Sequence, residues 1–546
     1  MFPNVKIIDI TNVTNFTCGA LQFCVKKMSI NYGKLSSVII KQCFGVTVQK
    51  VSDCLFDAIS RSLSNIVKST KLTRREVTNA LAVLIKFQLV TFKPSDLNPT
   101  IAEYSIRRDE ILYILRYSRY VHLAQTKYGT IGASIVEELL QSGSQTTSHV
   151  ILRCFSNTDN KDKLETYRDS MITMIGDNYL IKLPLLQQQE GDSELIPKLH
   201  IEPYDVFIPP DIDLAAIQQL HSGQTVPLKD AGIYWQVNFA RFHQDFRDTI
   251  MISAIERKHG ASAGECFRYI LKQMYERTDP WQKQSSNPFT FVEIKQAIEK
   301  KSNNLELMKY LDQYVMLIAD DSLGFIRRIG EMGGGQYIVE MEHAFQQLAL
   351  ACIENVITER FGSKASRIFR VIKMKKFIEQ EEIQKEAMIP AKEAKLLAYN
   401  LFQEQFTQIK TIRKAGGGGS GPAKAFYLFH VKHKQVVKML LDICFKALFN
   451  AITRSNYEKS ENKRLIEKSQ KLDSIVETMK ERGESEEYIA EILETLTPPE
   501  REILEKVKAR IKTLSNAELA LDDTIFLLQM YLFHSSVPKY TTTKTK

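Results

Sequence analysis

The sequence predicts a mainly α-helical protein with small β-hairpins, built from four tandem extended winged-helix domains followed by a C-terminal α-helical coiled-coil stalk. Two observations support this prediction. Apolar residues at helical spacing lead into paired short strands, and this order recurs along the chain. Near the C-terminus, apolar residues instead alternate by three and four, which is typical of coiled coils.

One stretch, from Phe361 to Val431, has the pattern of a whole winged helix. Its third helix has a clear start, since Pro390 stands where a missing N–H costs nothing, and a glycine-rich tip separates two alternating strands. The expected elements are helices over Arg360–Lys376, Glu379–Glu386 and from Pro390 onward, then strands over Phe406–Ile412 and Ala425–Val431.

A second copy lies near the N-terminus at a constant offset of 317 residues, so that Phe44-Gly45 matches Phe361-Gly362. The apolar positions stay in phase without a gap, which predicts tandem domains with separate small cores. Tyr128-Gly129 repeats the pair, and a third copy is expected to begin near Tyr234.

These matches predict the following domain order. A flexible N-terminal extension covers 1–27, winged helices cover 28–122 and 123–186, a polar linker covers 187–230, further winged helices cover 231–345 and 346–434, the stalk covers 435–534, and a disordered tail covers 535–546.

The predicted stalk has two apolar seams, one from Val437 to Leu448 and one from Leu465 to Met479. A turn at Arg482-Gly483-Glu484 would reverse the chain, and Pro498-Pro499 would interrupt the returning helix. Because a stalk can offer an apolar stripe to a partner, its candidate partner-binding residues are Leu441, Leu448, Leu465, Leu472 and Val476.

Composition places the chain among ordinary globular proteins, with 546 residues, 44% hydrophobic and 25% charged. A net charge of +9 permits an acidic partner such as nucleic acid without requiring one. Eight widely spaced cysteines favour reduced thiols, and neither a secretory signal nor a membrane span is found, so we expect a cytosolic or nuclear protein.

The sequence contains no phosphate-binding glycine loop, no nucleophile elbow and no zinc-ligand spacing. His430 and His433 lack acidic or cysteine companions, which disfavours a metal site. We therefore expect no enzyme, no cofactor and no metal.

Sequence-specific DNA reading is also disfavoured, because the third helices are nearly neutral. Their charges are +2, 0, −1 and 0 for Thr73–Lys86, Lys163–Ile175, Leu305–Ala319 and Pro390–Glu404.

Basic charge collects instead on an acid-free stretch of the fourth domain. It fits two interpretations equally, a solvated helix face or a row that faces phosphates. The candidate nucleic-acid residues are Arg360, Lys364, Arg367, Arg370, Lys373, Lys375 and Lys376, with Arg327 and Arg328 as weaker candidates.

Five longer motifs resemble the C-three family of DNA-directed RNA polymerase III, whose members are winged-helix subunits. The motifs are YWQVNFARFHQDFRD (Tyr234–Asp248), RFGSKASRIFR (Arg360–Arg370), AMIPAKEAK (Ala387–Lys395), ENKRLIEKSQ (Glu461–Gln470) and DDTIFLL (Asp522–Leu528). That family has four tandem extended winged helices and a coiled coil, and is related to the alpha subunit of the polymerase II promoter-opening factor.

The resemblance implies a nuclear, non-catalytic, polymerase III-specific subunit. It would join two smaller subunits in a peripheral trimer over the clamp of the largest subunit, meet initiation factors and non-specific promoter DNA, and aid initiation and promoter opening. It implies no membrane contact. The extension before Met28 and the spacer-like Gly416–Gly421 depart from the family pattern.

Two other classes compete with this interpretation. A winged-helix scaffold outside transcription, of the cullin or proteasome-lid kind, fits the neutral third helices equally well but does not account for the long motifs. A sequence-specific repressor is weakened by the same charge count.

Overall fold

A computed structural model of the chain describes residues 29–95, 98–156, 164–187, 196, 198–202, 205–224, 226–278, 285–301, 304–413, 425–482, 495 and 497–536. Three predicted features lie outside these residues: the extension over 1–27, the glycine tip over 416–421 and residues 537–546 of the expected tail. The reversal expected after Arg482 also lies outside them.

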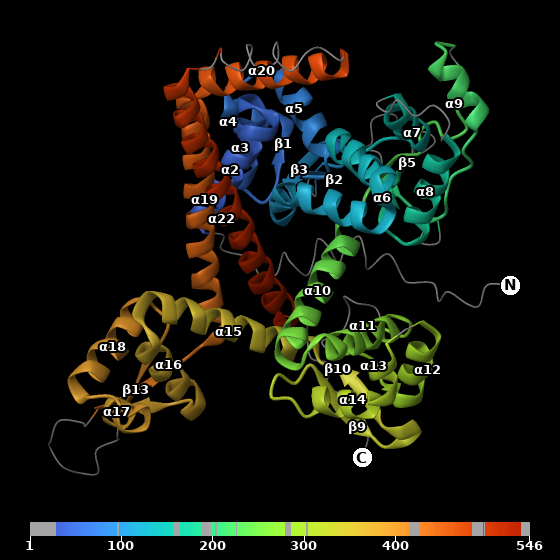
Figure 1. Cartoon of the computed structure of the whole chain (residues 1–546). Coiled ribbons are helices and arrows are strands. Elements are labelled where there is room, and N and C mark those ends of the chain that lie inside the picture. Colours follow the sequence, from blue (N-terminus) through green and yellow to red (C-terminus); the bar gives the residue numbers. More distant parts are fainter. Residues whose placement is uncertain are drawn as a thin grey trace.

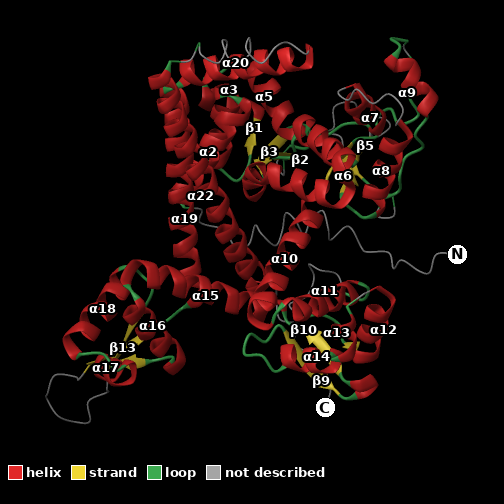
Figure 2. Ribbon diagram, viewed as in Figure 1, coloured by secondary structure: helices red, strands yellow, loops and turns green. Residues whose placement is uncertain are grey.

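The described chain is mainly helical with small antiparallel sheets, which confirms the predicted mixture of helices and hairpins (Figure 2). Four units, each with helices and one or two small sheets among the described residues, lie around a pair of long C-terminal helices, α19 (His433–Glu461) and α22 (Pro498–Ser536). We number the units in chain order. In Figure 1, units 1 and 2 lie at one end of this pair of helices, and units 3 and 4 lie at the other.

Unit 1 consists of helices followed by a three-stranded sheet in the order β1-β3-β2. Thr73 begins its last helix, because its side chain accepts from the Glu76 N–H while the Glu76 carboxylate accepts from the Thr73 N–H. The elements are α2 (Ile30–Phe44), α3 (Val46–Phe56), β1 (Arg61–Ser62), α4 (Leu63–Thr70), α5 (Arg74–Lys86), β2 (Val90–Pro94) and β3 (Ala102–Ile106).

Unit 4 repeats unit 1 in the register that the sequence predicts, since β11, α17 and α18 each begin 317 residues after β1, α4 and α5. The turn between the last two helices also matches, because Lys71 (φ 56) and Met388 (φ 52) are both left-handed. The elements are α15 (Met341–Phe361), α16 (Ser363–Lys375), β11 (Ile378–Glu379), α17 (Gln380–Ala387), α18 (Ala391–Gln403), β12 (Gln408–Arg413) and β13 (Ala425–His430).

Unit 2 ends later than the sequence indicates. The pairing of Leu180 with Val237 places a strand from beyond the predicted linker in the sheet of unit 2, where Trp235 is fully buried. The segment over 187–230 therefore lies, in sequence, between two paired strands, and we count both strands in unit 2. The elements are η2 (Arg108–Arg116), α6 (Tyr117–Ser142), α7 (Thr147–Ser156), α8 (Leu164–Gly176), β4 (Leu180–Lys182), β5 (Leu185–Gln187), β6 (Lys198–His200), α9 (Leu214–His221) and β7 (Trp235–Val237).

Unit 3 follows with a sheet in the order β8-β10-β9. The single helix expected over Leu305–Ala319 is interrupted at Tyr310, whose φ of −116° and ψ of 23° are not helical. The elements are α10 (Phe239–His259), α11 (Ala261–Tyr275), β8 (Phe289–Thr290), α12 (Phe291–Lys301), α13 (Leu305–Lys309), α14 (Leu311–Ala319), β9 (Ile326–Gly330), η3 (Met332–Gly334) and β10 (Gln336–Val339).

One backbone feature recurs in every unit, a glycine with positive φ between the entering helix and the next one. Gly45, Gly129, Gly260 and Gly362 have φ values of 87, 73, 93 and 84°. Since a side chain is strained there, each helix pair turns at a glycine. The Phe-Gly and Tyr-Gly pairs in the sequence mark three of these turns, while His259-Gly260 forms a turn that the sequence pattern did not predict.

The C-terminal helices do not form one continuous helical hairpin. α19 ends at Glu461, and α20 (Lys463–Arg482) crosses the end of the α19–α22 pair instead of extending it (Figure 1). Pro498 begins α22 rather than breaking it, in agreement with the tolerance of proline in a first helical turn.

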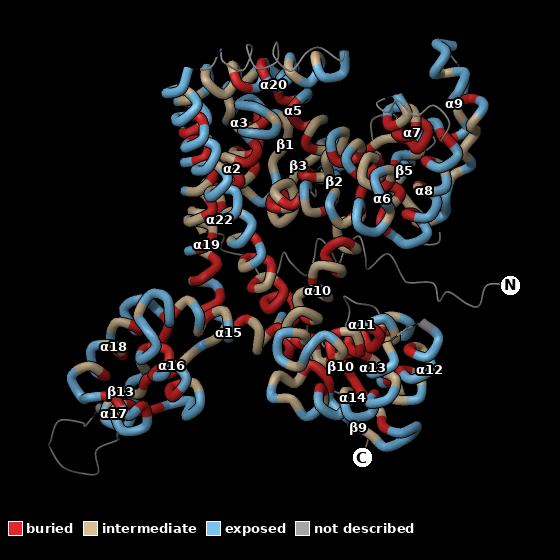
Figure 3. Tube along the Cα trace, in the orientation of Figure 1, coloured by how far each residue is buried: buried red, intermediate tan, exposed pale blue. Residues whose placement is uncertain are grey.

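Burial follows this arrangement (Figure 3). One continuous apolar cluster includes units 1, 3 and 4 with α19 and α22, whereas unit 2 has a cluster of its own. The long helices thus share a core with three of the units.

Candidate nucleic-acid interface

The predicted basic row lies on α16 and the turn that follows it. Ile368 and Ile372 are fully buried on the inner side of this helix, as their spacing predicts. Lys364, Arg367 and Arg370 lie on its exposed side. Whether these cations can bind a phosphate depends on the charges of the side chains around them.

Acidic side chains from neighbouring helices neutralise much of the row. Lys364 Nζ lies 2.7 Å from Glu393 of α18, and Arg370 Nε lies 2.6 Å from Glu354 of α15. Two further pairs are Lys375–Glu386 at 2.9 Å and Arg360–Glu404 at 3.7 Å. Arg367 donates to the Ala387 carbonyl at 3.4 Å. The stretch is acid-free in sequence but not in space.

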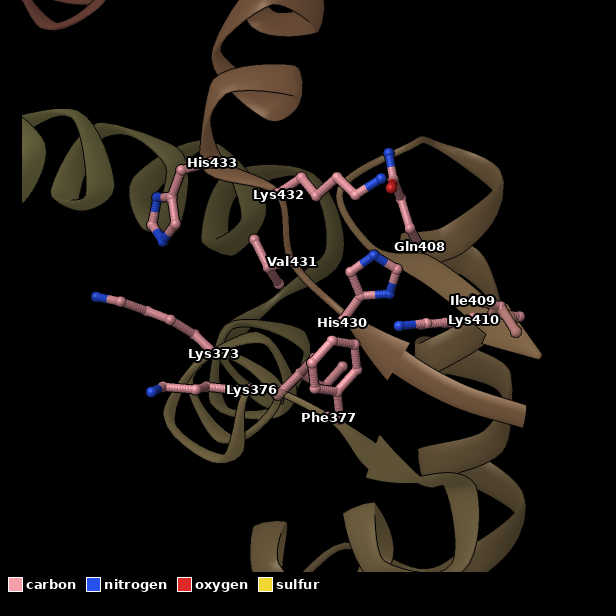
Figure 4. A pocket seen from close by; sticks show the side chains of 11 residues that line it. Lys373, Lys376, Phe377, Gln408, Ile409, Lys410, His430, Val431, Lys432 and His433 are labelled. Carbon is pink, nitrogen blue, oxygen red and sulfur yellow. The ribbon is translucent and has the colours of Figure 1, made fainter. Parts of the chain in front are cut away.

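Lys373 and Lys376 differ from these residues. No acidic partner is found for either amino group within the described ranges, and both side chains line a pocket of about 640 Å³. The pocket also takes residues from β12, from β13 and from the start of α19 (Figure 4). The lining residues are Ile372, Lys373, Lys376, Phe377, Gln408, Ile409, Lys410, His430, Val431, Lys432 and His433. We call this site the basic pocket.

The lining of the basic pocket has one sign of charge. It contains four lysines and two histidines and no carboxylate. The N-terminus of α19 adds to this, because Lys432 caps the helix without a side-chain hydrogen bond and its first turn holds no acidic residue. A helix N-terminus carries a partial positive charge and free N–H groups, so the pocket favours anions.

The basic groups of the pocket disfavour one another's protonation. Burial lowers the pKa of Lys373. Burial, and then the Lys373 charge, lower the pKa of His433. Burial, Lys432 and Lys410 lower the pKa of His430, against the opposing effect of hydrogen bonds to the Gln408 and Leu428 backbone. A bound anion would reverse the effect of these neighbouring charges.

An aromatic surface borders the pocket. The Phe377 ring is 48% exposed and lies 5.3 Å from the His430 ring, and Lys410 Nζ lies 5.3 Å from the Phe377 centroid. The His430 side chain is buried, with 9% of the residue exposed, and its Nδ1 has no hydrogen-bond partner within the part of the chain described. A buried histidine ring therefore lies beside an exposed phenyl ring in the lining of the pocket.

The weaker candidates Arg327 and Arg328 are exposed on β9 of unit 3, away from the basic pocket in unit 4 (Figure 1). Arg327 pairs with Glu340 at 2.7 Å. The structure does not bring these arginines together with the α16 row.

The candidate partner residues are divided by burial. Leu441, Leu448 and Leu472 are buried within the chain, so each offers little surface to a partner in this arrangement. Leu465 and Val476 are half-buried on α20. The first seam packs inward because α19 lies against unit 1, where the Tyr32 and Phe445 rings are 4.9 Å apart.

Sequence reasoning missed Lys410 and Lys432, and it considered His430 and His433 only as metal ligands. No local pattern links these residues to α16, because strand pairing brings them there. The described residues contain no group of three or more histidine, cysteine, aspartate or glutamate side chains placed to hold a metal ion. Among the described helices, none has the length and apolar character of a membrane span.

Comparison with known families first defines the class. Residues 34–95 match the RNA polymerase III subunit RPC82 helix-turn-helix domain, and residues 353–431 match the POLR3C C-terminal winged-helix domain. Units 1 and 4 are thus helix-turn-helix and winged-helix domains. Residues 205–348 match RNA polymerase III subunit RPC82, and residues 464–527 match the helical hairpin domain of subunit RPC3.

Whole-chain relatives give the family. The chain is 34% identical over 528 residues to DNA-directed RNA polymerase III subunit RPC3 of Bos taurus, with 91% of this chain and 98% of the relative covered. The identity is 33% for the Homo sapiens and Danio rerio proteins of the same name, at the same coverage. The chain belongs to the RNA polymerase III subunit RPC3 family, which confirms the resemblance seen in the motifs.

Proposed function

We propose that this chain is a non-catalytic subunit of RNA polymerase III, that it joins two smaller subunits in a peripheral trimer over the clamp of the largest subunit, and that it aids initiation and promoter opening in the nucleus. The observation that carries the proposal is the coverage of the relatives, because 98% of the cattle protein aligns with 91% of this chain. Initiation factors and non-specific promoter DNA are the further partners.

The architecture supports this role. We infer that all four units are extended winged helices of tandem origin, because each has the helix–glycine–helix turn and a small sheet. We also infer that α19, α20 and α22 serve as the stalk. Leu465 and Val476, half-buried on α20, remain the proposed partner-binding residues of the stalk.

Non-specific contact is the mode of DNA binding that the surface supports. A phosphate backbone is met by lysines and arginines without base readout, and its affinity falls steeply with salt. The available lysines lie in the basic pocket of unit 4. The α16 residues that are paired with glutamates are weaker candidates for phosphate contacts. They remain candidates because an exposed ion pair contributes only about 0–1 kcal/mol, so a phosphate can replace the glutamate.

Co-purification tests this proposal. The full chain, tagged and expressed in cells of its source, should recover RNA polymerase III subunits when bound proteins are identified by mass spectrometry. It should also localise to the nucleus by fluorescence. Recovery of ubiquitin-ligase or proteasome components without polymerase subunits would instead support a scaffold outside transcription.

A further inference from the structure

The basic pocket is built from parts of the chain that are distant in sequence. Lys373 and Lys376 come from the end of α16, Lys410 from β12, and Lys432 from the start of α19. None of these four amino groups forms a salt bridge among the described residues, although Glu354 raises the pKa of Lys373, whereas Lys364 and Lys375 of the α16 row are paired with glutamates. Lys376, Lys410 and Lys432 are exposed, and positive charges that line one concave site raise the local concentration of anions there.

Two further features are directed at the same place. The first turn of α19 contains no acidic residue and has no side-chain cap, so the N–H groups of His433 and Lys434 have no acceptor among the described residues, whereas those of Gln435 and Val436 donate to the Lys432 carbonyl. His430, nine-tenths buried, also lines the pocket; its Nδ1 is buried without a hydrogen-bond partner within the described chain, while the ring is hydrogen-bonded to the backbone of Gln408 and Leu428. When protonated, this atom is a hydrogen-bond donor.

We propose that the basic pocket binds successive backbone phosphates of a nucleic-acid strand, and that the strand enters together with a proton taken up by a pocket histidine. The proposal rests on the proposed function only for the identity of the anion. The pocket of about 640 Å³ is open to solvent along one side and has more room than a single phosphate requires. The half-exposed Phe377 ring can contact a base or sugar beside the phosphates.

The proton linkage follows from the neighbours of each histidine. His433 has the Lys373 charge as its electrostatic neighbour, while His430 has Lys432 and Lys410. The acidic group associated with this cluster is Glu354, which raises the pKa of Lys373 but is paired with Arg370. Burial and lysines lower both histidine pKa values, and a phosphate bound beside them would raise these values, so binding takes up a proton.

The first experiment measures binding of a fluorescent oligothymidylate to the full chain across a salt titration. Lys373→Gln, Lys376→Gln and Lys410→Gln combined should reduce the log–log salt slope by about 0.7 per lost contact, or about 2 in total. The matched control is Lys364→Gln with Lys375→Gln, which removes lysines from the same helix that are already paired with Glu393 and Glu386. The control variant should lose less of the salt slope for each lysine removed.

The second experiment measures the affinity of the same oligonucleotide at about pH 6 and about pH 8, where histidine titrates. Binding should tighten toward the lower pH by at most about tenfold per unit, the limit for one linked proton. His430→Gln combined with His433→Gln should flatten this dependence. Calorimetry in two buffers of different ionisation enthalpy counts the proton directly.

Several results would overturn the inference. One is a salt slope that is unchanged in the triple lysine variant. Another is a control variant that loses as much salt slope per lysine as the triple variant does. The third is a pH dependence of binding that persists after both histidines are replaced. Displacement of the oligonucleotide by inorganic phosphate, or by a phosphopeptide of equal charge, at the same concentration would assign the pocket to another anion. Circular dichroism shows whether each variant is folded. If the binding experiments fail but the chain still co-purifies with RNA polymerase III subunits, only the pocket proposal is overturned. If the binding experiments succeed but co-purification fails, only the proposed function is overturned.

Discussion

The Arg116 guanidinium donates from Nε to both carboxylate oxygens of Asp522, at 2.9 and 3.0 Å, although the residues are 406 positions apart. Both side chains are buried, and Arg119 donates to the same carboxylate. The pair joins η2, at the start of unit 2, to the C-terminal half of α22. It shows how the last helix is held against the first half of the chain.

Breaking this pair should be costly. Arg116→Met leaves the Asp522 charge buried with only Arg119 beside it, and the expected loss in unfolding free energy is about 3–5 kcal/mol. Urea unfolding followed by circular dichroism measures it. Arg116→Met combined with Asp522→Leu should recover part of the loss, because no unpaired carboxylate remains at position 522. A double variant less stable than the single one would contradict this account.

A charge inside the α19 seam should destabilise the long helices. Leu448 is 1% exposed, so Leu448→Asp buries a carboxylate without a partner and should cost several kcal/mol. Ile443→Asp is the matched control on the same helix, at a side chain that is 37% exposed. Thermal melting should separate the two variants clearly, and equal melting temperatures would show that α19 does not pack as described.

Acid should weaken the contact between α15 and α22. His534 is buried and stacks on Phe345 at 5.4 Å, and burial, together with Arg247, lowers the pKa of His534 to about 3. In the unfolded chain, His534 takes up a proton below about pH 6.5. The stabilisation that comes from burying its neutral ring is therefore complete above that pH. It is lost as pH falls toward 3, by at most roughly 1.4 kcal/mol per unit.

The comparison that isolates this histidine is His534→Phe, which keeps the stacked ring. Urea unfolding at about pH 7 and about pH 5 should show a smaller loss of stability in the variant than in the wild type. His243, whose pKa is also lowered well below its usual value by burial, remains in both proteins and cancels in the difference. Equal acid sensitivity would assign the effect to other groups.

Freeing a paired lysine should strengthen nucleic-acid binding. Glu393→Gln removes the partner of Lys364, so that one more amino group can meet a phosphate. We expect tighter oligothymidylate binding and a salt slope steeper by about 0.7. Glu359→Gln on α15 removes the same charge from an exposed residue and releases no lysine, so it should leave the slope unchanged. Equal slopes for both variants would rule out pairing as the cause.

Much of the fold was predictable because helices and turns are set by local residues. The 317-residue offset placed the elements of units 1 and 4 in register, down to the left-handed Lys71 and Met388. The boundary of unit 2 was not predictable in this way. A three-residue strand such as Trp235–Val237 has no periodicity of its own, so its pairing with β4 is visible only after folding.

The sequence by itself determined the helical character, the repeated unit and the run of cations on α16, since each depends on spacing along the chain. Only the tertiary structure decided which cations are available. Glu393 neutralises Lys364 from 29 residues away, while Lys410 and Lys432 join Lys373 through strand pairing and the start of α19. The physical reason is that charges interact through space over a few ångströms, and packing rather than sequence distance sets which ones meet.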